Sequence, residues 1–149
     1  MKTLKIIIVL VFLAIGSINL AAHCEIPCGI YEDSVRINLI REHITTMEKS
    51  MDQIKKLKNG DAVEYNQLVR WILNKEDHAI KLQNIVTQYF MTQRIKPGTE
   101  NYDKKLSTLH KLLIYSMKGK QTTDLKNIKM LRYLADQFEA LYIEKKLKI

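Results

Sequence analysis

Apolar residues recur three and four positions apart along most of the chain, which is the spacing of one face of an α-helix. The first such segment begins at Asp33 or Ser34, either of which can cap a helix, and it ends at Asn59-Gly60. Its apolar positions are Ile37, Ile40, Ile44, Met47, Met51 and Ile54. This pattern predicts one long amphipathic helix.

A second helical stretch follows residues 61–64, whose Asp-Ala-Val-Glu order is a capping-box pattern. The polar segment Asn74 to His78 in its middle predicts a kink or an exposed turn. The residues expected to face inward are Tyr65, Leu68, Val69, Ile72, Leu82, Ile85, Val86 and Tyr89.

Two further helices are expected after a connection over residues 92–101, which contains Pro97-Gly98. The third helix runs from Tyr102 to about Lys118, where Gly119 is expected to stop it, and Thr122 or Thr123 can cap the fourth. The inward residues of these two helices are predicted to be Leu106, Leu109, Leu113, Met117, Leu125, Ile128, Leu131, Leu134, Phe138 and Leu141.

The composition agrees with a single helical domain. The chain has 149 residues, of which 46% are hydrophobic and 27% charged, so it can bury a core. Five glycines and two prolines are too few for a turn-rich β fold. We therefore predict an all-α protein in which residues 32–149 form an antiparallel four-helix bundle, preceded by a separate amino-terminal segment.

Residues 1–22 have the three parts of a secretory signal peptide. Lys2 and Lys5 form the charged start, an apolar run follows over residues 6–15, and Ala21-Ala22 precede the expected cut. Cleavage would make His23 the first residue of an exported protein, in the periplasm or outside the cell, with no stable membrane insertion. A cut after Ala21 and an uncleaved membrane anchor are the alternatives.

The nine residues from 23 to 31 hold both cysteines of the chain. A mature chain that begins His23-Cys24 offers an amine, an imidazole, an amide nitrogen and a thiolate, and Cys28 can add a second thiolate. A nearly planar set of nitrogen and sulfur donors suits Ni(II) or Cu(II) better than Zn(II), which prefers a tetrahedron. The alternative is a Cys24–Cys28 disulfide, common in exported proteins, and the chain would then be an exported helical binding protein.

The sequence of residues 23–31, HCEIPCGIY, resembles the amino-terminal hook of the nickel-containing superoxide dismutases. Their pattern is H-C-x-x-P-C-G-x-Y, and its six fixed positions are met by His23, Cys24, Pro27, Cys28, Gly29 and Tyr31. The resemblance implies a nickel ion held by His23, Cys24 and Cys28, with Tyr31 guarding access to it. It also implies a homohexamer that converts superoxide to dioxygen and hydrogen peroxide by Ni(III)/Ni(II) cycling.

The remaining chemistry-bearing residues suggest no second activity. His43, His78 and His110 lie outside any Glu-x-x-His or His-Glu-x-x-His pattern, so surface or packing roles are predicted for them. The formal net charge is +8, and loss of Lys2 and Lys5 leaves 22 basic against 16 acidic residues, or +6. Positive potential attracts an anionic substrate such as superoxide. No recognition motif supports binding of nucleic acid.

Overall fold

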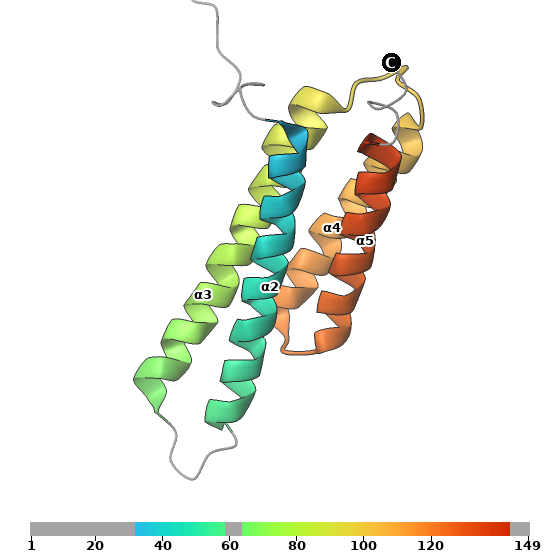
Figure 1. Cartoon of the computed structure of the whole chain (residues 1–149). Coiled ribbons are helices and arrows are strands. Elements are labelled where there is room, and N and C mark those ends of the chain that lie inside the picture. The colour runs from blue at the N-terminus through green and yellow to red at the C-terminus, as the bar shows by residue number, and fades with distance from the viewer. Residues whose placement is uncertain (1–31, 59–63, 144–149) are drawn as a thin grey trace, which may run out of the picture.

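The computed structural model describes residues 32–58 and 64–143, and every secondary-structure element in them is a helix (Figure 1). Residues 1–31 are outside the described part, so the predicted signal peptide and the hook at 23–31 are not seen. The described elements are α2 (Asp33–Lys58), α3 (Tyr65–Asn84), the π-helix η1 (Ile85–Arg94), α4 (Tyr102–Gln121) and α5 (Leu125–Ile143). The prediction of an all-α fold is confirmed.

The four α-helices run antiparallel to their neighbours along the chain, as Figure 1 shows. Helix α2 packs against α3 and α5, and α4 completes the ring by packing against the same two helices. The predicted four-helix bundle is therefore confirmed. Within the described residues, none of the helices is long and apolar enough to cross a membrane.

The core follows the predicted apolar face of α2 closely. All six predicted positions of this helix are buried, and Ile44, Met47 and Met51 are fully so. Helix α5 contributes Ile128, Leu131, Leu134 and Phe138, as predicted, while Leu125 and Leu141 lie only partly covered. Full burial of an aliphatic side chain stabilises a fold by roughly 1.5–3 kcal/mol. These two helices thus supply much of the energy that holds the bundle together.

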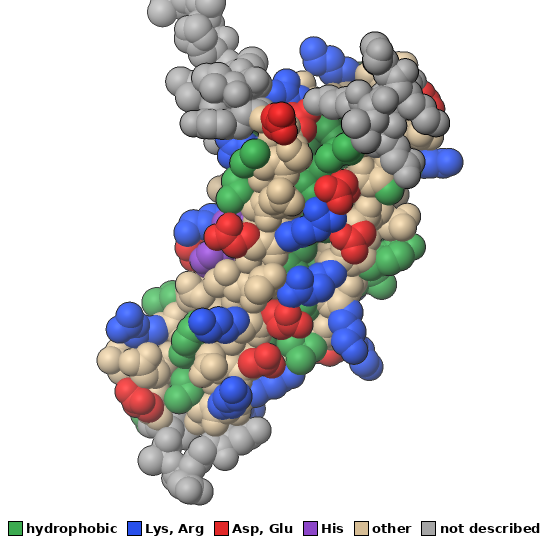
Figure 2. Space-filling view, in the orientation of Figure 1, with side chains coloured by type: hydrophobic (Ala, Val, Ile, Leu, Met, Phe, Trp, Pro, Cys, Tyr) green, Lys and Arg blue, Asp and Glu red, His purple; other side chains and the backbone are tan. Residues whose placement is uncertain are grey.

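Ion pairs at the surface connect α2 to α5. Arg41 contacts Asp136 at 2.8 Å and Glu139 at 2.5 Å, and Arg132 contacts Glu48 at 2.6 Å. In Figure 2, basic and acidic side chains alternate down the face where these helices meet. Because the groups are at least 31% exposed, each pair adds little to stability. Their alternation favours one alignment of the two helices.

The polar segment Asn74 to His78 forms neither a kink nor a turn, contrary to the prediction, and α3 runs through it. Its polar side chains find partners on other elements. The Lys75 ammonium donates to the carbonyls of Lys120 and Thr122, and the Asn74 amide donates to Ser50 Oγ at 2.9 Å. Because these bonds satisfy the polar groups inside the bundle, the helix has no reason to break here.

The irregular part of this stretch lies further on, in η1. The N–H of Ile95 donates to the carbonyl of Phe90 five residues earlier, at 2.9 Å. A π-helix takes more residues per turn than an α-helix and thereby rotates the side chains that follow it. It extends the stretch to Arg94, so the connection to α4 begins at Ile95 rather than at residue 92.

Three residues predicted to face inward on α3 are instead exposed: Tyr65 at 73%, Val69 at 52% and Ile72 at 38%. Figure 1 shows the reason, because the ends of α2 and α3 extend past the turn that joins α4 to α5. The apolar residues there are not covered by α4 or α5. The predictions for Leu82, Val86 and Tyr89 are confirmed, because all three are buried.

The buried face of α4 is rotated by about one residue from the predicted one. Leu109 is buried as expected, but Leu106 and Leu113 are only partly covered and Met117 is 40% exposed. The face that packs inward is formed by Lys105, Leu109, Leu112, Ser116 and Gly119. Small residues at this contact let the helices approach closely.

Two contacts of α4 show how close this approach is. The Ser116 hydroxyl donates to the carbonyl of Ala79 on α3 at 3.1 Å. A Cβ placed on Gly119 would lie 2.7 Å from Met47 Cε on α2. Gly119 therefore sits inside α4 as a packing residue instead of stopping it, and the helix continues to Gln121.

Asp124, rather than Thr122 or Thr123, provides the cap of α5. Its Oδ1 accepts a hydrogen bond from the backbone N–H of Lys126 at 2.9 Å, as an N-cap side chain does. The Thr122 hydroxyl accepts from the N–H of Asp124 at 3.3 Å and so supports the turn ahead of the cap.

Candidate metal centre

The predicted ligands His23, Cys24 and Cys28, and the predicted access residue Tyr31, all lie outside the described residues. The structure does describe the place where their segment joins the bundle, at Asp33 in the first turn of α2. Asp33 is 6% exposed, which is unusual for a carboxylate at the end of a helix. The partners of Asp33 therefore show which side chains hold the chain where the hook segment joins the bundle.

Three side chains from other elements surround the Asp33 carboxylate. The hydroxyl of Tyr89 donates to Oδ1 at 2.5 Å, and the hydroxyl of Tyr142 donates to Oδ2 at 2.9 Å. The Arg94 guanidinium forms an ion pair with Oδ1 at 3.2 Å and donates to the Tyr89 hydroxyl at 3.0 Å. We call Asp33, Tyr89, Arg94 and Tyr142 the Asp33 cluster. It joins α2, η1 and α5 at one end of the bundle.

The π-helix contributes two of these four residues. Tyr89 and Arg94 are five residues apart in η1, close to one π-turn, so both can reach the same carboxylate. Their side chains also stack, because the Arg94 guanidinium lies 4.8 Å from the centre of the Tyr89 ring. Arg36 of α2 lies 5.1 Å from that ring centre. The winding of η1 thus places Tyr89 and Arg94 on the side of the helix that faces Asp33.

Burial fixes the protonation of both phenols. It raises the pKa of Tyr89 above its ordinary value, and the hydrogen bond to Asp33 raises this pKa further. Burial and the same carboxylate also raise the pKa of Tyr142. Both hydroxyls therefore keep their protons at neutral pH and remain donors to Asp33.

Aromatic packing supports the cluster from the core side. Phe90 and Phe138 are almost fully buried, with ring centroids 4.8 Å apart in an edge-to-face arrangement. Tyr142 stacks on Phe138 at 5.3 Å and meets Phe90 at 5.5 Å. Such pairs stabilise by about 0.5–1.5 kcal/mol beyond the area that they bury. The start of α2 is therefore held firmly.

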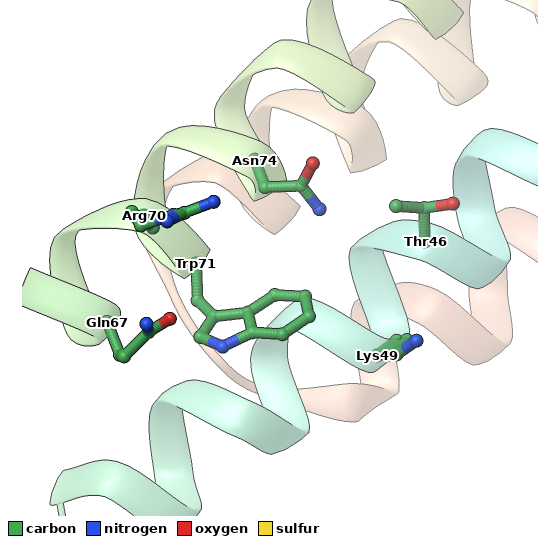
Figure 3. Close-up of a pocket in the computed structure, with 6 residues that line it drawn as sticks. All are labelled: Thr46, Lys49, Gln67, Arg70, Trp71 and Asn74. Carbon is green, nitrogen blue, oxygen red and sulfur yellow. The ribbon is translucent and has the colours of Figure 1, made fainter.

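A different surface feature, a groove between α2 and α3, offers no metal chemistry. It has a volume of about 450 Å³ and is lined by Thr46, Lys49, Gln67, Arg70, Trp71 and Asn74. Figure 3 shows the Trp71 indole reaching from α3 toward α2. None of the six side chains is a carboxylate, thiolate or imidazole. The Trp71 side chain therefore packs between the two helices at this groove.

Two features were not foreseen from the sequence. Asp33 was expected only as a helix cap, and nothing in its spacing pointed to Tyr89, Arg94 and Tyr142 as partners. His43 and His78 were read as isolated, but the structure brings their rings together, with Nδ1 atoms 3.1 Å apart. Helical phase could have placed them on facing sides of α2 and α3. Within the described residues, no group of three or more histidine, cysteine or acidic side chains is arranged to hold a metal ion.

The structure defines the class of protein as a four-helix bundle, and the sequence places a segment with an imidazole and two thiols directly ahead of it. The family model of nickel-containing superoxide dismutase matches residues 18–146, which include both the hook and the bundle. The chain belongs to this family. It is accordingly a superoxide dismutase with nickel as its cofactor and superoxide as its substrate. Neither the curated proteins nor the solved structures gave a match.

Proposed function

We propose that the mature chain begins at His23 and binds nickel with five donors of the hook. These are the amine and imidazole of His23, the amide nitrogen and thiolate of Cys24 and the thiolate of Cys28. Nickel bound in this way would supply one-electron chemistry between Ni(II) and Ni(III), by which one superoxide would be oxidised to dioxygen and a second, with two protons, reduced to hydrogen peroxide. The observation that supports this function most strongly is the family match across residues 18–146.

The donor set fits this chemistry. Thiolates and a deprotonated amide are anionic donors that stabilise a high oxidation state, and an imidazole nitrogen suits nickel. The amine of His23 is a donor only when residues 1–22 have been removed, since in a peptide bond it is an amide. Signal-peptide cleavage, export to the periplasm or beyond, and assembly of the metal site are therefore parts of one proposal.

The Asp33 cluster supports the proposed role of Tyr31. Tyr31 precedes Asp33 by two residues, so chain connectivity keeps the two Cα atoms within about 7 Å of each other. The Asp33 carboxylate is held by Tyr89, Arg94 and Tyr142. The chain is therefore anchored to the bundle two residues after Tyr31. We propose that this anchoring lets the Tyr31 hydroxyl restrict access to the metal and position water or superoxide beside it.

We also propose that the chain assembles with copies of itself, as a homohexamer. One side of α3 carries exposed apolar residues at helical spacing, among them Val69 at 52%, Leu73 at 61% and Ile80 at 43%. Apolar residues gathered on one helix face favour contact with another protein surface. Sedimentation of the nickel-loaded mature protein should give the mass of a hexamer, and a monomer at micromolar concentration would contradict this.

The sharpest test of the ligand set adds one alanine before His23 of the mature chain. The imidazole and both thiols stay in the protein, but the amine moves away from His23. We expect superoxide dismutation to be lost and nickel content to fall, with unchanged helicity by circular dichroism. The matched control adds one alanine after Ile149 and should retain both activity and nickel.

The exported binding protein with a Cys24–Cys28 disulfide predicts different results. Its mass would fall short of the reduced mass by two hydrogens, it would contain no nickel, and nickel loading would not produce activity. Full activity in the variant extended before His23 would rule out the proposed amine ligand while leaving the enzyme assignment intact. Mass, metal content and activity measured on one preparation therefore separate the two interpretations.

A further inference from the structure

His43 of α2 and His78 of α3 face each other across the contact of these two helices. Their Nδ1 atoms are 3.1 Å apart, and the rings meet edge to face with centroids at 5.0 Å. Within the described residues, the hydrogen bond between the two rings is the only one that either ring makes. Both rings are partly buried, and Figure 2 shows histidine side chains at the surface with acidic and basic side chains beside them.

The separation of the two nitrogens matches the bite of a metal chelate. Imidazole nitrogens bind zinc at roughly 2.0–2.1 Å, so two of them in a tetrahedral site lie about 3.3 Å apart, and about 2.9 Å apart at a right angle. The observed 3.1 Å falls between these values. A metal ion could therefore replace the shared proton after only a small adjustment of the rings.

The backbone on both sides of the pair is fixed by the core. Ile44 follows His43 on α2 and is fully buried, and Ala79 follows His78 on α3 and is also fully buried. The two helices cannot separate at this point without exposing these residues. A site whose ligands come from two packed helices loses little freedom on binding, which favours affinity.

The surroundings of the pair favour a neutral imidazole. Burial is the largest influence on the pKa of His43, which it lowers, while the smaller effects of Glu42 and Asp77 raise this pKa and that of Lys81 lowers it. The positive charge of Lys81 is partly compensated by its 2.6 Å ion pair with Asp77. Burial, followed by the neighbouring His78, lowers the pKa of His43 overall. At neutral pH this ring is therefore uncharged and has a lone pair to donate.

We propose that His43 and His78 form a second metal site, a two-imidazole clip for a divalent transition-metal ion such as Zn²⁺, separate from the amino-terminal hook. No third ligand from the described residues converges on the pair, so water completes the coordination. A clip of this kind binds reversibly and more weakly than a closed structural site, which has four protein ligands. It would link α2 to α3 and stabilise the fold when the ion is bound.

Zinc binding to the mature chain with Cys24→Ser and Cys28→Ser tests the clip. These substitutions remove the thiolates of the hook and leave the bundle unchanged. Equilibrium dialysis should find about one zinc ion per chain, with a rise in melting temperature as zinc is added. Adding His43→Gln or His78→Gln to this chain should weaken binding at least about tenfold and abolish the rise, because one ligand is lost.

His110 provides the matched control, since it lies exposed on α4, away from the pair. His110→Gln in the same background should bind zinc as the parent chain does. The inference is overturned if the Cys24→Ser, Cys28→Ser chain retains no zinc. It is equally overturned if either His43→Gln or His78→Gln keeps its helicity and binds zinc like the parent, since the bound ion would then not need both rings. Because the two variants alter different helices, either one that keeps its helicity decides the question.

Discussion

Tyr65, Val69 and Leu73 lie exposed in the first half of α3, whereas Leu82, Val86 and Phe90, further along the same stretch, are fully buried. Both halves carry apolar residues at helical spacing. They differ first in the side of the helix that they occupy: at about 100° per residue Leu73 lies about 180° from Leu82, and Ile80, in the second half, is also 43% exposed. The comparison teaches that helical phase, together with the extent of α4 and α5, which cover only the second half (Figure 1), decides which apolar residues enter the core. It also shows that the covered half is the one that reaches the Asp33 cluster.

The largest effect is expected from Phe90→Ala in the covered half. Phe90 is fully buried and contacts Phe138 and Tyr142, so its removal leaves a cavity beside the Asp33 cluster. The free energy of unfolding should fall by about 4 kcal/mol. Urea denaturation followed by circular dichroism measures this. A loss below about 1 kcal/mol would mean that this end of the bundle is less tightly packed than described.

A smaller loss is expected from Asp33→Asn. The substitution keeps the shape but removes the charge that pairs with Arg94, and an amide can accept from only one of the two tyrosines. The free energy of unfolding should fall by about 2 kcal/mol. Asp52→Asn, further along α2, is the matched control and should change it by less than about 0.5 kcal/mol. Equal effects at the two positions would remove the reason for treating the Asp33 cluster as an anchor.

The free energy of unfolding should depend on pH through the Tyr89 phenol of the same cluster. The pKa of Tyr89 is raised on folding, so its contribution is complete below about pH 10, the ordinary pKa of tyrosine, and is lost as the pH rises through the folded value. Tyr89→Phe should cost about 1 kcal/mol at neutral pH. Above about pH 10, its unfolding free energy should fall less steeply than that of the parent. Parallel curves between about pH 9 and 12 would show that the phenol is not held as described.

The smallest effect on unfolding is expected from Leu73→Asp in the uncovered half. Leu73 is 61% exposed, so the free energy of unfolding of the dilute monomer should change by less than about 0.5 kcal/mol. If α3 forms the proposed contact between copies, the same substitution should shift sedimentation toward the monomer, because a carboxylate would enter an apolar interface. Unchanged assembly would place the subunit contact on another surface.

The fold was largely predictable from the sequence because its helices have regular apolar faces. Every predicted inward position of α2 is buried, and the four α-helices lie close to their expected ranges. The errors arose where tertiary contacts outweigh local pattern. Lys75 keeps α3 helical by bonding to carbonyls of another helix, and Gly119 is retained within α4 because a larger residue would meet Met47.

The site was predictable only in part, for a related reason. The ligand set was predicted from residues 23–31 because all its donors lie within nine positions, and it stays a prediction because these residues are outside the described part. The partners of Asp33 lie 56 to 109 positions away along the chain, so no local pattern connects them. His43 and His78 are likewise 35 positions apart, and only the packing of α2 on α3 brings them together.

The winding of η1 makes the amino-terminal end of the bundle sensitive to chain length. Deleting one residue from Ile85–Arg94 would let this segment relax to an ordinary helix, and the residues after the deletion would turn to other directions. Tyr89 and Arg94 would then no longer both point at Asp33. Point substitutions leave this geometrical relation in place, whereas a shortened segment breaks it even when every remaining side chain is conserved.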